Sequence, residues 1–216
     1  MNIQDKIRGC FLGIAIGDAL GKPVESYSAK RIKDNFKRIT QYEDCNNHKY
    51  FQDDLRGTTT DDWQLTKAVA QGFIDAGDFD LESIAKRHVE EFHVSVRGWG
   101  SSTRESVENL VNDMNWEQSG VTEQKNRGLG NGVSMKVAPV GIFLAMKNLA
   151  GPSSIAVLEK LVSLALMTHR TDIAVSSGIA HSFATMYCMT ETPETFNKKN
   201  FIEITNKIEE TCQRIT

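Results

Sequence analysis

Two adjacent carboxylates, Asp61 and Asp62, follow three threonines in the chain and have the side chains best suited to chemistry. An amphipathic helical pattern starts directly after them, so Thr60 is expected to cap the N-terminus of a helix. A cap needs one oxygen, whereas two neighbouring carboxylates repel each other. Hydroxyl and carboxylate oxygens together are the ligands that a hard cation such as Mg²⁺ prefers. This segment alone leaves two interpretations open: a metal site of Thr60, Asp61 and Asp62, or a capped helix with both carboxylates in water.

Three further junctions between a helical pattern and a loop carry polar residues that folding alone does not require. They are the segments Gly17–Glu25, Gly128–Pro139 and Thr168–Asp172. Glycines in the second segment allow a positive φ and present backbone N–H groups to an anion at a helix start. Each junction alone is explained as a cap or a turn. Together they place polar residues at the ends of apolar helices, which is where helical bundles build sites.

The elements that must position these residues are predicted to be helices. Apolar residues recur every three to four positions through most of the chain, and almost no alternation of period two is present. We therefore expect one all-α domain over residues 1–216, with residues 22–57 as a loop or flap and 115–132 as a loop. Helices are expected over residues 3–21, 65–73, 81–92, 102–111, 136–149, 155–167 and 172–187, and from 201 to the end. Ser102 and Glu105 have the spacing of a capping box.

Four glycines recur at every fourth position of the first predicted helix: Gly9, Gly13, Gly17 and Gly21. Each glycine costs a helix interior about 0.8–1.0 kcal/mol relative to alanine, so the row needs a reason. A row of this kind forms a smooth groove along the helix. Packing of another helix is the expected use of the groove, and close approach of a ligand beside Asp18 is the alternative.

Composition excludes several classes of function. The chain of 216 residues has a formal net charge of −3, which gives no basic surface for nucleic acid. Residues 9–21 are apolar but are interrupted by Asp18 and are too short to span a bilayer, so no membrane segment is expected. The four cysteines form no CxxC pair. Reduced thiols and a cytoplasmic location are therefore expected.

Taken in order, the four junctions resemble the motifs of the ADP-ribosylglycohydrolase family, the relatives of dinitrogenase reductase-activating glycohydrolase. The segment Gly130–Pro139 resembles the family's Gly-Asn-Gly-x-x-Met-Arg-x-x-Pro motif, with Lys136 where the family usually has arginine. The other matches are Gly17–Glu25 to Gly-Asp-Ala-Leu-Gly-x-Pro-x-Glu, Thr60–Asp62 to the Thr-Asp-Asp metal turn, Arg97–Thr103 to a Gly-x-Gly-x-Thr loop, and Thr168–His169 to the Thr-His turn.

The resemblance implies a compact orthogonal multi-helix bundle that holds two Mg²⁺ ions and removes ADP-ribose from a modified side chain or a related ADP-ribosyl substrate. The implied metal ligands are Thr60, Asp61 and Asp62. The implied catalytic set is Glu25, Asp61 and Asp62, with Glu25 as the group for proton transfer. The implied partner is ADP-ribose or an ADP-ribosylated protein. Residues implied to bind it are Gly98, Gly100, Gly130, Asn131, Gly132, Ser134 and His169.

Besides Lys136, the chain departs from the family pattern at two further places. It has no Gly-Gly-Asp-x-Asp-Thr sequence, which supplies further metal ligands in the family. We therefore expect a C-terminally incomplete domain, a poor hydrolase and possible self-association, because a missing cover exposes apolar surface. The alternative is a catalytically inactive protein that binds ADP-ribose or is structural on the same fold. The loop from Arg97 to Gly100 has no aspartate, which favours an O-linked or nucleotide substrate over modified arginine.

Overall fold

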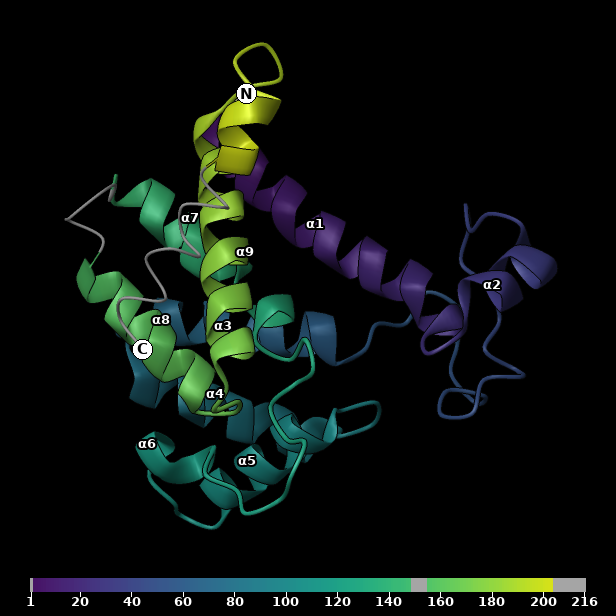
Figure 1. Cartoon of the computed structure of the whole chain (residues 1–216), viewed down its shortest axis with the longest axis horizontal. Helices are drawn as coiled ribbons and strands as arrows, with labels where there is room; N and C mark the ends of the chain where they lie inside the picture. The colour runs from purple at the N-terminus through teal and green to yellow at the C-terminus, as the bar shows by residue number, and fades with distance from the viewer. Residues whose placement is uncertain (1, 149–154, 204–216) are drawn as a thin grey trace.

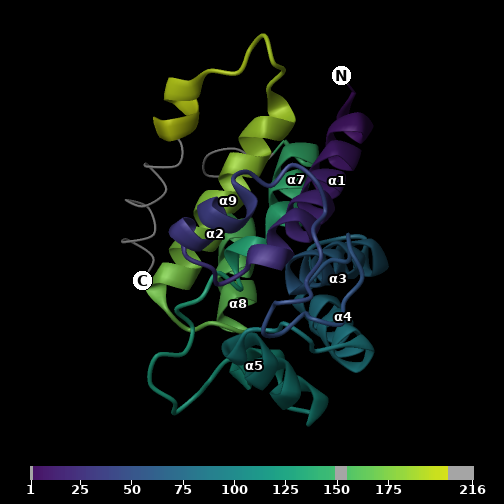
Figure 2. The ribbon, with the colours of Figure 1, turned by 90° about the vertical axis from the view of Figure 1, so that its right-hand side faces the viewer.

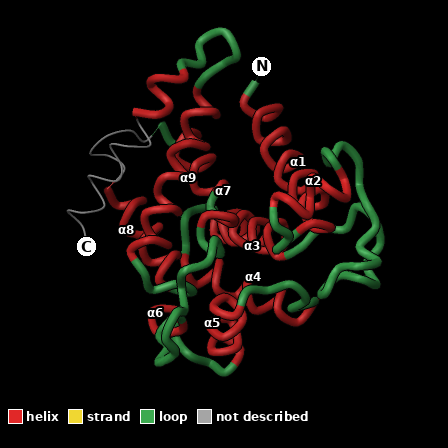
Figure 3. Tube along the Cα trace, turned by 45° about the vertical axis from the view of Figure 1, so that its right-hand side comes forward, coloured by secondary structure: helices red, strands yellow, loops and turns green. Residues whose placement is uncertain are grey.

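The computed structural model of the chain describes residues 2–148 and 155–203, and all regular structure within them is helical (Figure 3). The all-α prediction is therefore confirmed. The helices cross one another in an orthogonal bundle (Figure 1). In chain order the elements are α1 Ile3–Gly21, η1 Lys22–Val24, α2 Ala29–Phe36, α3 Asp61–Ala76, α4 Leu81–Val94, α5 Ser101–Val111, α6 Trp116–Ser119, η2 Ser134–Lys136, α7 Ala138–Met146, α8 Ile155–Leu166 and α9 Asp172–Thr190.

Polar side chains fix where several of these helices begin. Thr60 caps α3 as predicted, since its hydroxyl accepts a hydrogen bond from the backbone N–H of Asp62. Asp80 and Thr171 cap α4 and α9 in the same way. Such caps satisfy N–H groups that lack a partner within the helix. Gly77 ends α3 in the left-handed conformation that glycine adopts without strain.

The main hydrophobic core lies among α3, α4, α7, α8 and α9. The closest pairings are α3 with α4 and α7 with α9, and Figure 2 shows α7 lying beside α9. Fully buried aliphatic side chains from these helices include Val69, Ile84, Val140, Leu144 and Leu164. The core therefore holds the bundle together on the side away from α2 and gives the polar ends of α3 and α9 fixed positions.

Within the described residues, no helix packs into the glycine row of α1. A Cβ built on Gly9, Gly13, Gly17 or Gly21 would meet no other atom of those residues within 4 Å. The expected packing of a helix is therefore not found in the described part of the chain, where α1 meets its neighbours through other positions. In this helix only Ala19 is buried. The alternative use, close approach of a ligand, becomes the better explanation.

Residues 22–57 are mostly irregular, as predicted, but they include a helix that the sequence pattern did not reveal. Helix α2 is capped by Ser28 and has no buried residue, and five of its eight residues are polar. It lies near the far end of α1 (Figure 1). The predicted loop 115–132 likewise contains the single turn of α6. The helix predicted from 201 to the end lies, beyond residue 203, outside the described residues. In the described part, no helix has the length and apolar character to cross a membrane.

Candidate active site

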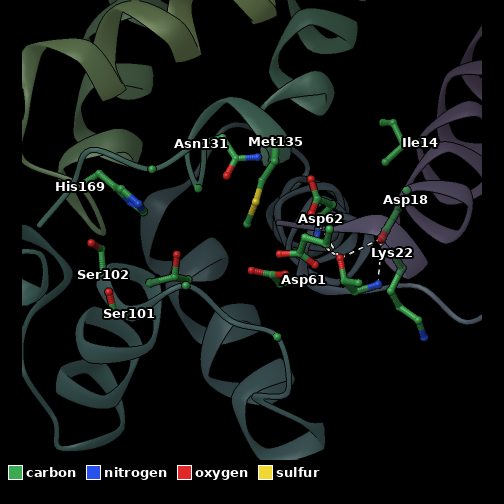
Figure 4. A pocket seen from close by; sticks show the side chains of 18 of the residues that line it. Ile14, Asp18, Lys22, Asp61, Asp62, Ser101, Ser102, Asn131, Met135 and His169 are labelled. Atoms are coloured by element: carbon green, nitrogen blue, oxygen red, sulfur yellow. Dashed lines mark hydrogen bonds between the residues drawn. The ribbon is translucent and has the colours of Figure 1, made fainter. Parts of the chain in front are cut away.

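The structure brings all four polar junctions to one cavity of about 630 Å³. Its walls come from α1, the N-termini of α3 and α5, the loop before η2, and the turn between α8 and α9. Figure 4 shows His169 and Ser102 on one side of this cavity and Asp18 and Asp62 on the other. We call the first side the histidine end (Gly130, Asn131, Gly132, His169) and the second the acid end (Asp18, Glu25, Asp61, Asp62). A volume of this size is typical of sites for small ligands and cofactors.

The acid end concentrates negative charge in a partly dehydrated space. Burial, and then the charge of Asp62, raises the pKa of Asp61 to about 7. Burial and the neighbouring Asp18 raise the pKa of Asp62. Partial burial and Asp62 also raise the pKa of Glu25, which lies at the exposed rim. Desolvation and like charges both disfavour the ionised form, so this end of the cavity favours binding of a cation.

Asp18 positions the acid end from a neighbouring helix. Its Oδ2 accepts hydrogen bonds from the backbone N–H groups of Thr60 at 2.8 Å and Trp63 at 3.0 Å, and its Oδ1 accepts one from the Thr60 hydroxyl at 2.8 Å. A side chain of α1 thus supplements the cap of α3. The sequence placed Asp18 beside the groove but gave no sign of this contact, because it joins residues more than 40 positions apart.

Lys22 is the lysine nearest in sequence to this cluster, but its amine is engaged elsewhere. The buried Lys22 Nζ donates to Asp54 Oδ2 at 2.9 Å and to the hydroxyl of Thr58. Within the described residues, neither Asp61 nor Asp62 takes part in an ion pair. Their charge is therefore not balanced by a basic side chain of that part of the chain.

The donor atoms of the acid end fit a hard cation. Thr60, Asp61 and Asp62 supply hydroxyl and carboxylate oxygens at one helix start, which are the atoms that Mg²⁺ prefers. In the described ranges, no three His, Cys, Asp or Glu side chains converge closely enough to hold a metal ion. Mg²⁺ is commonly held by one or two carboxylates, with water and substrate oxygens completing its shell. The predicted ligands thus fit one side of a magnesium site.

The histidine end is formed largely by backbone and by one neutral imidazole. Gly130, Asn131, Gly132 and His169, which the resemblance implies to bind the ligand, all line the cavity. The space in front of the imidazole depends on Gly132, because a Cβ there would lie 2.5 Å from Cε1 and 2.8 Å from Nε2 of His169. Burial, and then the nearby Lys136, lowers the pKa of His169 to about 3, so the ring is neutral.

The start of α5 forms the floor between the two ends. Gly98 and Gly100 line the cavity, as predicted, and Gly98 has a φ of +82°. Gly100 precedes the first turn of α5, and no side chain caps that turn. The predicted capping box of Ser102 was wrong, because the Ser102 hydroxyl instead accepts a hydrogen bond from the Gly128 N–H at 2.8 Å. An uncapped helix start favours an anionic ligand.

One predicted ligand-binding residue lies apart from the others. Ser134 does not line the cavity, and its hydroxyl donates to the carbonyl of Asn131 at 3.1 Å. It therefore stabilises the loop that carries Asn131. Sequence analysis also did not predict that Ile14 and Met135 line the cavity, where Figure 4 shows Met135 between the two ends and Ile14 beside Asp18. Both are apolar residues of helical segments and carry no signal of ligand contact.

An all-helical fold with acidic and glycine-rich segments around one cavity is the architecture of a class of ADP-ribosyl-bond hydrolases. The family model described as ADP-ribosylglycohydrolase matches residues 1–216, and the chain belongs to this family. The chain is 28% identical over 189 residues to an uncharacterised protein of Archaeoglobus fulgidus, covering 84% of the chain and 55% of that protein. It is 25% identical over 197 residues to the ADP-ribosylhydrolase ARH3 of Xenopus tropicalis, covering 88% and 53%, respectively.

A similar match exists with the protein YegU of Escherichia coli, at 25% identity over 191 residues, covering 83% of the chain and 53% of YegU. The chain thus spans about half the length of the curated relatives that it matches. Membership of the family supports hydrolysis of ADP-ribosyl bonds in general.

Proposed function

We propose that this chain provides the ADP-ribose site and part of the metal site of an Mg²⁺-dependent hydrolase that releases ADP-ribose from a modified side chain or a related substrate. The observation that carries the proposal is the shared cavity, which joins an acid end to a glycine-lined end. A ligand with a charged middle and several hydroxyl groups matches both. Family membership supports the same class of substrate.

The ADP-ribose would lie along the cavity with its negative charge over the floor. The uncapped start of α5 and the backbone of Gly130 to Gly132 supply N–H groups for the diphosphate. Gly98 and Gly100 leave room beside the ribose that carries the scissile bond. His169 offers a neutral imidazole to an oxygen of the ligand. These contacts would hold the scissile bond towards the acid end.

Thr60, Asp61 and Asp62 are the proposed ligands of Mg²⁺. When bound, the metal supplies a charge that orients ribose hydroxyls and acidifies a coordinated water. Glu25 lies beside this cluster at the rim, where partial burial and the charge of Asp62 raise its pKa and favour its acceptance of a proton. In hydrolysis, the bond from the anomeric carbon to the leaving group breaks and a water oxygen bonds to that carbon. Glu25 accepts the proton that the water loses and passes it to the leaving group, so the carboxylate is regenerated and no other proton source is needed.

Calorimetry with ADP-ribose, with and without Mg²⁺, tests this proposal. We expect binding that strengthens with Mg²⁺, and an Asp61→Asn, Asp62→Asn double variant that loses the Mg²⁺ effect. Asp44→Asn is the matched control, because Asp44 is an exposed carboxylate paired with Arg56. Binding that is equal with and without Mg²⁺ would favour the alternative of a non-catalytic ADP-ribose-binding protein. No binding under either condition would contradict both.

Catalysis needs a separate measurement. Release of ADP-ribose from modified serine and modified arginine peptides, in parallel, would show whether the chain cleaves either bond and which one. The missing aspartate in the loop from Arg97 to Gly100 leads us to expect the serine peptide to be preferred. The cytoplasmic location and self-association stay predictions. Size-exclusion chromatography at several protein concentrations tests the latter.

A further inference from the structure

A continuous series of hydrogen bonds leads from the bundle core to the ligand cavity. It begins at the carbonyl of Ile84, 2.9 Å from His88 Nδ1, and continues from His88 Nε2 to Lys136 Nζ at 3.2 Å. Lys136 Nζ lies 3.1 Å from the hydroxyl of Thr168, and that hydroxyl lies 2.9 Å from Nδ1 of His169. Of these residues, His169 lines the cavity, and the others lie behind it.

In the first part of this series, the donor and the acceptor of each hydrogen bond can be assigned. A carbonyl oxygen only accepts hydrogen bonds, so Nδ1 of His88 must carry the hydrogen. Burial lowers the pKa of His88 to about 3, so the ring is neutral and its Nε2 has a lone pair. Lys136 must therefore donate to His88. The only donor that faces this nitrogen in the described residues is the Lys136 amine.

The second part follows from counting hydrogens on Lys136. Among the described residues, the amine has two acceptors within reach, His88 Nε2 and the Thr168 hydroxyl oxygen. An ammonium has three hydrogens and no lone pair, and a neutral amine has two hydrogens, so either form has a hydrogen for each acceptor. The Thr168 oxygen thus accepts from Lys136. Its own hydrogen is directed to Nδ1 of His169, the other partner of that oxygen in the described chain.

We propose that Lys136 is a positioning residue that acts through Thr168 to hold His169 as the tautomer with hydrogen on Nε2. Nδ1 of His169 then accepts from Thr168, and Nε2–H points to the open side of the ring, beside Gly132. The cavity is thereby given a fixed hydrogen-bond donor. The ligand atom that it recognises is an acceptor oxygen, such as a phosphate or ribose oxygen. The identity of that ligand rests on the proposed function, whereas the tautomer does not.

The burial of Lys136 needs such a reason. Its side chain is fully buried and forms no ion pair within the described residues. An unpaired buried amine destabilises a fold, and an apolar side chain of similar length would fill the same space without that cost. Burial, and then the charge of Lys136, lowers the pKa of both His88 and His169, so both rings are neutral. A neutral ring is the state in which the choice of tautomer matters.

The tautomer can be observed directly, without any ligand. In the full chain labelled with ¹⁵N-histidine, long-range proton–nitrogen correlation spectra distinguish the two ring nitrogens. The His169→Gln variant assigns the His169 signals. We expect the Nε2–H tautomer in the unmodified chain and in Thr168→Ser, which keeps the hydroxyl. Thr168→Val, of the same shape without the hydroxyl, should give a mixture of tautomers. An Nδ1–H tautomer in the unmodified chain would overturn the proposal.

Lys136→Met tests the lysine itself, since it keeps the length and removes the donors. It should also give a mixture of tautomers, and an unchanged Nε2–H tautomer would overturn the role of Lys136. If this variant does not fold, Lys136→Arg replaces it. Retention of the Nε2–H tautomer with arginine, together with its loss in Thr168→Val, supports the proposal, and its loss with arginine overturns it.

Affinity for ADP-ribose gives a second measurement. Thr168→Val should bind ADP-ribose about twofold more weakly than Thr168→Ser, because an equal mixture of tautomers leaves the Nε2–H donor in about half of the population. Equal affinities would contradict the assigned donor role. If the unmodified chain does not bind ADP-ribose, the proposed function fails, while the spectra still decide the tautomer.

Discussion

At the acid end of the cavity, Asp61 and Asp62 lie together and form no ion pair within the described chain. At the histidine end, by contrast, hydrogen bonds join His169 to Thr168 and Lys136, which lie behind it. Both regions lie at the ends of helices of the same bundle. The acid end keeps charge that favours an added cation. The histidine end has its hydrogen bonds arranged before any ligand arrives. One end therefore depends on a bound partner, and the other is preorganised.

The largest effect expected at the histidine end concerns the pH dependence of stability. Burial lowers the pKa of Lys136 to about 7 from its ordinary value of 10.5. The unfolded chain then binds more protons between these values, so Lys136 makes the fold less stable as pH falls from about 10 to 7. The slope is at most about 1.4 kcal/mol per pH unit. The free energy of unfolding, measured with urea, should rise between pH 7 and pH 9 by about 2 kcal/mol more in the unmodified chain than in Lys136→Met. An equal rise in both would show that burial does not lower the pKa of Lys136.

The next effect concerns the space at the histidine end. A Cβ at Gly132 would lie 2.5 Å from Cε1 of His169 and 2.9 Å from the hydroxyl oxygen of Thr103. Gly132→Ala should therefore weaken ADP-ribose binding by about tenfold or more, since such overpacking costs about 1–3 kcal/mol. Gly9→Ala is the control, because Gly9 lies outside the cavity and a Cβ there meets no atom of the described residues within 4 Å. Calorimetry on both variants decides, and equal losses would show that the two glycines are not distinguished by the His169 ring.

At the acid end, Asp18→Ala tests whether Asp18 positions the proposed metal ligands or only caps α3. It removes the acceptor of the Thr60 and Trp63 N–H groups and should destabilise the fold by about 1–2 kcal/mol in thermal or urea unfolding. It should also weaken Mg²⁺-dependent binding. Asp80→Ala removes the cap of α4, away from the cavity. It should reduce the stability of the fold and leave Mg²⁺-dependent binding unchanged. If both variants lose the Mg²⁺ effect equally, that loss follows from stability and not from the position of Asp18.

The smallest effect is expected at the floor. Ser102→Ala removes the hydrogen bond to Gly128 N–H and should cost about 1 kcal/mol in unfolding experiments. Ser101→Ala is the control, because Ser101 is exposed and its hydroxyl has no described partner. A larger loss at Ser101 than at Ser102 would mean that the loop is held in another way.

Local patterns predicted much of the fold, because helix positions and the Thr60 cap depend on nearby residues. The four junctions met at one cavity, as the family resemblance implied. The capping box of Ser102 failed because α5 begins one residue earlier than expected and the hydroxyl bonds a distant loop. Helix α2 was missed because it has only eight residues, most of them polar, within a segment rich in turn residues. The series of hydrogen bonds through Lys136 was not predictable either, since His88 and Thr168 are 48 and 32 positions away from Lys136 in sequence.

The glycine row of α1 has a consequence for redesign. Gly13, Gly17 and Gly21 line the cavity and face open space, so that wall consists of bare backbone. Successive glycines are about 6 Å apart along the helix axis, because each residue advances about 1.5 Å. Alanine at one of these positions would place a single methyl at a known height along the wall. Comparing the affinity of a ligand for the three single alanine variants would show which positions along this wall the bound ligand reaches.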